Sequence, residues 1–163
     1  MPNKTLTIEK VLDILDGTPR RIDQLTAGLP PSLLRTAPAG GEWSANDVLA
    51  HLRACADVRG GALLRIIAED RPTIRAVDPR SYLTQTDHLD LEFQTSIAAF
   101  AAQRQELMAA LHRLPRDDWL RMATVTGAGA VLERTVLFYG QWLAGHERAH
   151  VKQIGRIVNA IRP

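Results

Sequence analysis

Residues 146–150 read His-Glu-Arg-Ala-His, the H-E-x-x-H pattern found in helical zinc sites. On a helix, His146 and His150 lie on one face with Cβ atoms roughly 6 Å apart, so both imidazoles can bind one ion at Zn–N distances of about 2.0 Å. Glu147 is offset from His146 by about 100°. We therefore predict a metal site at the two histidines, with Glu147 as its candidate catalytic base. The alternatives are two hydrogen-bonded core histidines and a solvated surface glutamate.

The same pattern occurs in zinc proteases, which need a third protein ligand, usually a histidine or glutamate further along the chain. Residues 151–163 contain neither. No strand-rich segment precedes the pattern to bind a peptide by edge pairing. The sequence therefore argues against a peptidase and places any third ligand upstream.

Among the upstream candidates, His51 is the best placed, because it falls on the apolar face of a predicted helix. Cys55 follows it by four residues and could itself bind a metal, although a lone buried cysteine usually packs as a small hydrophobic residue. His88 and His112 fall near the two ends of another predicted helix, and we interpret both as surface residues. Since Cys55 is the only cysteine, an internal disulfide and a cysteine-pair zinc site are excluded.

The length of 163 residues predicts one domain that spans residues 1–163. The apolar fraction of 45% and the charged fraction of 23% are those of an ordinary globular protein. No apolar run approaches the ~20 residues of a membrane span, and the N-terminus lacks the pattern of a secretory signal, so we expect a cytoplasmic protein. The basic residues behind the net charge of +2 are scattered among acidic ones, which argues against nucleic-acid binding.

Helical periodicity predicts four helices, and strand signals are weak throughout. The first helix covers residues 7–26. We expect it to break within residues 16–21, where Thr18 can cap a new helix and Pro19 can open its first turn. The second helix begins at Ser44, which is expected to form a capping box with Asp47. The residues on its apolar side are Val48, His51, Leu52, Cys55, Ala62 and Ile66.

The third predicted helix covers residues 86–114, and the fourth runs from about residue 131 nearly to the end of the chain. The third has a seam formed by Phe93, Ile97, Phe100, Arg104, Leu107, Leu111 and Leu114. The fourth has a stripe formed by Leu132, Val136, Tyr139, Leu143, His146, His150, Ile154 (or Gln153), Ile157 and Ile161. Alternating steps of four and three residues are typical of helix bundles. We therefore predict an all-α four-helix bundle in which the two histidines of the stripe face the interior.

Three stretches resemble the DinB-like superfamily of metalloenzymes: EWSANDVLAHL, AAFAAQRQELMAALHRLP and HERAHVKQI. The resemblance covers most of the chain, from the first helix to Ile154. It implies a four-helix bundle with long crossover connections, often dimeric. It also implies a divalent metal held by one histidine of the second helix and two of the fourth, which correspond here to His51, His146 and His150.

The superfamily includes transferases and isomerases that use mycothiol, bacillithiol or glutathione, so the resemblance implies a low-molecular-weight thiol as cofactor. Our leading interpretation is a small-molecule enzyme whose three-histidine site leaves a fourth position open for Lewis-acid activation of a bound thiol or water. Zinc or nickel is the expected ion, although neutral imidazoles suit zinc, nickel, iron and copper alike. The alternative is a metal-free helical module for binding or dimerisation.

Two further expectations concern binding. Arginines on or near the second and third helices could hold a substrate carboxylate, although such residues are more often solvated or structural. These are Arg53, Arg59 and Arg104.

A homodimer built by helix packing is expected from the resemblance and from apolar positions that we take as exposed. Those positions are Leu12, Leu15 and Phe138.

Overall fold

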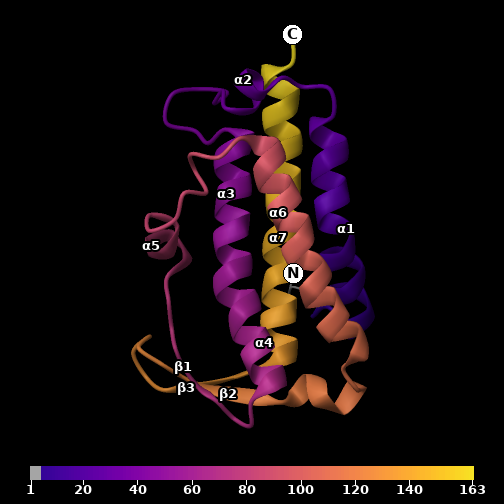
Figure 1. Ribbon diagram of the computed structural model, residues 1–163, viewed down its shortest axis with the longest axis vertical. Coiled ribbons are helices and arrows are strands. Elements are labelled where there is room, and N and C mark those ends of the chain that lie inside the picture. Colours follow the sequence, from indigo (N-terminus) through magenta and orange to yellow (C-terminus); the bar gives the residue numbers. More distant parts are fainter. Residues whose placement is uncertain (1–4) are drawn as a thin grey trace.

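The computed structural model describes residues 5–163 and contains long helices that run side by side (Figure 1). They are α1 (Ile8–Thr26), α3 (Ala45–Cys55) continued by the π-helix η1 (Ala56–Gly60) and α4 (Gly61–Ala68), α6 (Phe93–Arg113) and α7 (Val136–Ile161). The shorter elements are α2 (Pro31–Leu34), β1 (Thr73–Arg75), α5 (Pro79–Leu83), the 3₁₀-helix η2 (Arg116–Leu120), β2 (Met122–Thr126) and β3 (Leu132–Thr135). The prediction of an all-α four-helix bundle is confirmed.

The start of the second long helix follows from local chemistry. The Ser44 hydroxyl accepts the N–H of Asp47 at 3.1 Å, and the Asp47 carboxylate accepts the N–H of Ser44 at 2.9 Å, which is the predicted capping box. The helix continues through η1 into α4, and η1 begins directly after Cys55. A π-helical turn inside a longer helix occurs often at functional sites. Here it lies on the helix that carries His51.

Helix α1 runs through Pro19 without the break that the sequence predicts. Proline has no N–H to donate to the carbonyl of residue i−4, so the carbonyl of Leu15 loses its helical partner. Arg104 of α6 replaces that partner, since its Nη1 donates to the Leu15 oxygen at 2.8 Å. The Thr18 hydroxyl donates to the Ile14 carbonyl at 2.8 Å rather than capping a new helix. The predicted break is therefore wrong because a distant side chain compensates for the proline.

Helices α6 and α7 start later than predicted. Residues 86–92 form turns, and the guanidinium of Arg35 donates to the carbonyl oxygens of Asp90 and Leu91 at 2.9 Å each. Helix α7 begins after Thr135, because the residues before it form β3 and pair with β2. The Thr135 hydroxyl caps the helix by accepting the N–H of Phe138 at 3.0 Å. Although α7 has 26 residues, no helix within residues 5–163 is long and apolar enough to cross a membrane.

A small sheet, which the weak strand signals did not predict, lies at one end of the bundle (Figure 1). Its order is β1-β2-β3, with β1 parallel and β3 antiparallel to β2. The register pairs Ile74 with Val125 and Met122 with Thr135. Positive φ angles of 85° and 87° at Gly127 and Gly129 allow the chain to turn between β2 and β3. The strands are too short, at three to five residues, for a strong alternating pattern.

Two apolar clusters fill the bundle, and the long helices contribute to both of them. One cluster includes Val11, Leu15, Leu63, Leu107, Leu111 and Leu143. The other includes Ile22, Leu49, Leu52, Phe93, Phe100 and Ile154. On α6 and α7, polar residues fall between the contributions to the two clusters: Arg104 between Phe100 and Leu107, and residues 146–150 between Leu143 and Ile154. The bundle therefore contains a polar layer near its middle, and this layer holds the predicted site.

Candidate metal centre

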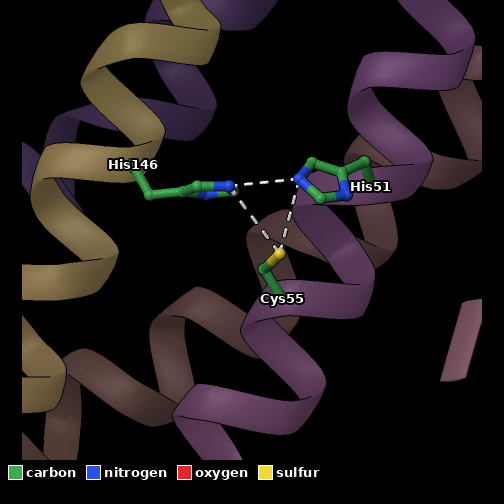
Figure 2. Close-up of side chains that lie close together, drawn as sticks. All are labelled: His51, Cys55 and His146. Carbon is green, nitrogen blue, oxygen red and sulfur yellow. Dashed lines mark hydrogen bonds between the residues drawn. The ribbon is translucent and has the colours of Figure 1, made fainter. Parts of the chain in front are cut away.

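Three imidazoles meet between α3 and α7. Nε2 of His146 lies 3.1 Å from Nε2 of His51 and 3.2 Å from Nε2 of His150. Figure 2 shows the His146 side chain pointing from α7 toward His51 on α3. The spacing of four residues puts His146 and His150 on one face of α7, and α7 packs against α3. The structure thus brings together the three histidines that the sequence selects.

The spacing of these nitrogen atoms fits a shared metal ion. With Zn–N distances of 2.0–2.1 Å, two nitrogen ligands of a tetrahedral ion lie about 3.3 Å apart. The observed distances of 3.1 and 3.2 Å are close to this value. In the metal-free protein, facing lone pairs repel unless a proton lies between them. The distances from His146 to His51 and to His150 therefore suit ligands of a divalent cation.

Cys55 is the fourth donor in this layer. Its Sγ lies 3.7 Å from Nε2 of His51 and 4.0 Å from Nε2 of His146 (Figure 2). The donor atoms of His51, Cys55 and His146 all lie within 4.8 Å of one another. Burial raises the pKa of the Cys55 thiol to about 12, with the nearby charge of Arg59 opposing this effect. The thiol is therefore protonated in the metal-free protein at neutral pH.

Burial also keeps the imidazoles uncharged. It lowers the pKa of His51 to about 4, with smaller contributions from His150 and Arg80. It lowers the pKa of His146 to about 3, with smaller contributions from the other two histidines and Arg59. Metal ions bind neutral imidazole, so at neutral pH no proton has to leave His51 or His146 before binding.

Neighbouring side chains orient the rings. The Oε1 atom of Gln153 lies 2.6 Å from Nδ1 of His150, so the amide oxygen accepts the Nδ1 proton and leaves the Nε2 lone pair free for a ligand. The Trp142 ring stacks on His146 with centroids 4.6 Å apart, and the Trp43 ring lies 5.2 Å from that of His51. The role of Trp142 was not predicted, although its position four residues before His146 places it on the same helix face.

Glu147 is buried in an ion pair and is not at the surface. Its side chain is 1% exposed and that of Arg104 is 4% exposed. Oε1 of Glu147 accepts Nη1 of Arg104 at 2.7 Å, and Oε2 accepts Nη2 at 2.5 Å. The same guanidinium binds the Leu15 carbonyl. This network joins α1, α6 and α7, so both carboxylate oxygens already have a partner.

The two remaining histidines differ in environment. His88, interpreted as a surface residue, is only 9% exposed, and its Nε2 lies 2.9 Å from Oδ2 of Asp57. That interpretation is wrong because the turns before α6 fold back onto η1, where Asp57 also accepts a hydrogen bond from the Tyr82 hydroxyl at 3.1 Å. His112 is exposed, as expected. Neither residue belongs to the group of mutually close donors, which consists of His51, Cys55 and His146; His150 adjoins that group through the contact of its Nε2 with Nε2 of His146.

Of the three arginines considered for anion binding, Arg59 is the one beside the site. Arg104 is engaged by Glu147, and Arg53 donates to the Ser96 hydroxyl at 3.1 Å. The guanidinium carbon of Arg59 lies 4.9 Å from the centre of the Trp142 ring. Its Nε is buried and has no hydrogen-bond partner within residues 5–163. Arg59 is therefore a partly buried cation whose Nε can still donate a hydrogen bond.

Comparisons with known proteins agree with this architecture. The family model of the DinB superfamily matches residues 14–154, a range that includes every residue of the metal centre. Among solved structures, the chain is similar to YfiT from Bacillus subtilis, described as "a probable metal-dependent hydrolase with an unusual four-helix bundle topology". The two are 19% identical with a TM-score of 0.69, and the match covers 96% of this chain and 91% of that one. At this identity the likeness shows the fold. No curated protein sequence matches the chain.

Proposed function

The chain belongs to the DinB superfamily, and we propose that it is a metal-dependent enzyme acting on a small molecule. We propose His51, His146 and His150 as ligands of one divalent ion. The observation that carries the proposal is the approach of their Nε2 atoms to 3.1 and 3.2 Å around His146. The description of YfiT as a metal-dependent hydrolase supports the same general chemistry. Zinc or nickel suits a set of imidazole ligands.

A divalent ion bound by neutral histidines would lower the pKa of a coordinated water or thiol and so supply a nucleophile at neutral pH. The residues around it have separate tasks. Gln153 fixes the tautomer of His150, and Trp142 holds the His146 ring by stacking. For Glu147, which the sequence suggests as a catalytic base, we propose a structural role, because Arg104 already binds both of its oxygens.

A pocket that Arg59 lines, and that is linked to the centre through the contact of Arg59 with Trp142, supports a small anionic substrate. It has a volume of about 480 Å³, which is in the range of small-molecule sites. Arg59, Arg65 and Arg75 line it together with Asp57, Tyr82 and Tyr139, and Arg65 is already paired with Glu69. Arg59 reaches from this pocket to the Trp142 ring that stacks on His146. A carboxylate on the substrate would provide the hydrogen-bond partner that Nε of Arg59 lacks within residues 5–163.

For the reaction, we propose the addition or transfer of a low-molecular-weight thiol to a small electrophile. A carbon–sulfur bond forms, and the thiol proton passes to the product or to the leaving group. The thiol is supported by the family resemblance and by the ability of a bound cation to favour thiolate. Hydrolysis by activated water is the second candidate, supported by the description of YfiT.

The test is an assay of the metal-loaded protein with a panel of low-molecular-weight thiols and a carboxylate-bearing electrophile. Turnover with at least one thiol is expected, and His150→Ala should reduce it at least about a hundredfold, since a misplaced catalytic centre costs that much. His112→Ala is the matched control, because His112 is exposed and outside the centre. Equal turnover by wild type and His150→Ala, or none with any thiol, would remove the transferase proposal. Absence of thiol turnover would leave hydrolysis as the candidate reaction, and only the absence of a bound metal would favour the metal-free binding module.

The homodimer and the cytoplasmic location stay predictions. Of the apolar positions invoked for dimerisation, Leu15 is fully buried and Leu12 partly buried, whereas Phe138 is 38% exposed. The expectation that Leu15 is exposed is therefore wrong, because it packs in the core. A homodimer predicts a mass of two chains by light scattering at micromolar concentration, and a mass of one chain would contradict it.

A further inference from the structure

We propose that Cys55 is itself a ligand of the metal ion, next to His51 and His146, so that in the resting protein its sulfur occupies a position needed by an incoming thiol. This inference rests on the proposed metal centre but not on the identity of the substrate. Its basis is that His51, Cys55 and His146 form the group of donors whose atoms all lie within 4.8 Å of one another.

The distances fit coordination by sulfur. With Zn–S near 2.3 Å and Zn–N near 2.0 Å, a sulfur and a nitrogen on one tetrahedral ion lie about 3.5 Å apart. Sγ of Cys55 is 3.7 Å from Nε2 of His51 and 4.0 Å from Nε2 of His146, so a shift of a few tenths of an ångström brings it into place. The sulfur faces the Nε2 atoms, which are the atoms that would bind the ion (Figure 2).

The position of Cys55 in the helix supports the same role. Cys55 lies four residues after His51, so both project from one face of α3 toward α7. The residue is 2% exposed but lies in the polar layer. If Cys55 acted only as a small hydrophobic residue, its packing would not require the sulfur to lie beside the nitrogen lone pairs of two histidines. The π-helical turn begins at the next residue, Ala56, and marks this part of the helix as irregular.

Ligation by Cys55 has a consequence for the reaction. On metal binding, the S–H bond of Cys55 would break, the sulfur would keep the electron pair and share it with the ion, and the proton would leave to solvent. A thiol substrate would then enter by replacing Cys55, whose sulfur takes up the proton that the substrate thiol releases. The protein's own cysteine would thus close the centre in the absence of substrate, as in four-ligand structural zinc sites.

Cobalt(II) substitution tests this inference directly. A thiolate bound to cobalt gives an intense charge-transfer absorption in the near ultraviolet, whereas imidazole ligands do not. Cys55 is the only cysteine of the chain, so this band in wild-type protein, prepared without added thiol, reports Cys55 alone. We expect one cobalt per chain with the band in wild type and in His112→Ala. The band should be lost in Cys55→Ala and in Cys55→Ser.

The outcomes separate this inference from the proposed function. Stoichiometric cobalt in the wild type without the band would overturn the role of Cys55 and leave the histidine centre intact. Failure of the wild type to bind cobalt would overturn both proposals. Because the decisive spectrum is that of the wild type, the result does not depend on the folding of the cysteine variants.

Discussion

Zinc affinity is expected to fall at least about a hundredfold when His146 is replaced by alanine. His146 is the central donor, since its Nε2 lies within 3.2 Å of Nε2 of both other histidines. Loss of a residue that only supports a metal ligand already costs 10–100-fold in affinity, so loss of a ligand should cost more. The measurement is a zinc titration of metal-free protein in competition with a chromophoric chelator.

The control for this experiment is His112→Ala, which removes an imidazole from the surface and should bind zinc like the wild type. Circular dichroism of both variants verifies that the helices are retained. If His146→Ala binds zinc as tightly as His112→Ala, the three histidines are not the metal site.

The second large effect concerns stability. Arg104→Met leaves the Glu147 carboxylate buried without its cation and removes the donor to the Leu15 carbonyl. Removing one partner of a buried ion pair costs about 3–5 kcal/mol. We therefore expect the free energy of unfolding of the metal-free protein, measured with urea, to fall by about that amount.

Arg53→Met is the matched control, because Arg53 makes a single hydrogen bond to Ser96 and should cost only about 1 kcal/mol. The variant Glu147→Gln separates the two roles of the glutamate. A structural Glu147 predicts lower stability with unchanged zinc affinity. Unchanged stability together with lost turnover in the metal-loaded variant would instead support the catalytic base suggested by the sequence.

Much of the fold could be predicted because its signals are local. The capping box of Ser44 and the seam of α6 depend on residues close together in the sequence. The continuous α1 could not be predicted, because the carbonyl released by Pro19 is satisfied by Arg104, which lies 89 residues after Leu15. The sheet was missed for a similar reason: its short strands are stabilised by pairing with residues far along the chain, such as Thr73 with Thr124.

The site shows the same division between local and distant information. Helical spacing placed His146 and His150 on one face and made His51 the best-placed upstream candidate, and the family resemblance implied the three together. Helical spacing did not reveal that Glu147 is more deeply buried than His146 and His150. A charged residue in the core requires a partner, and only the fold supplies that partner. That partner, Arg104, was recognised as an arginine in an apolar seam but could not be matched to Glu147. The orientation of Cys55 and Trp142 likewise depends on how α3 and α7 pack.

The central claim is that this bundle holds one divalent ion at its histidine cluster. The most direct test is elemental analysis of wild-type protein that has been purified without added metal or chelator. The proposed centre predicts close to one zinc or nickel per chain, which dialysis against a chelator removes and a single equivalent restores. Less than about a tenth of an equivalent of any divalent metal, with no uptake when zinc or nickel is supplied, would contradict the claim.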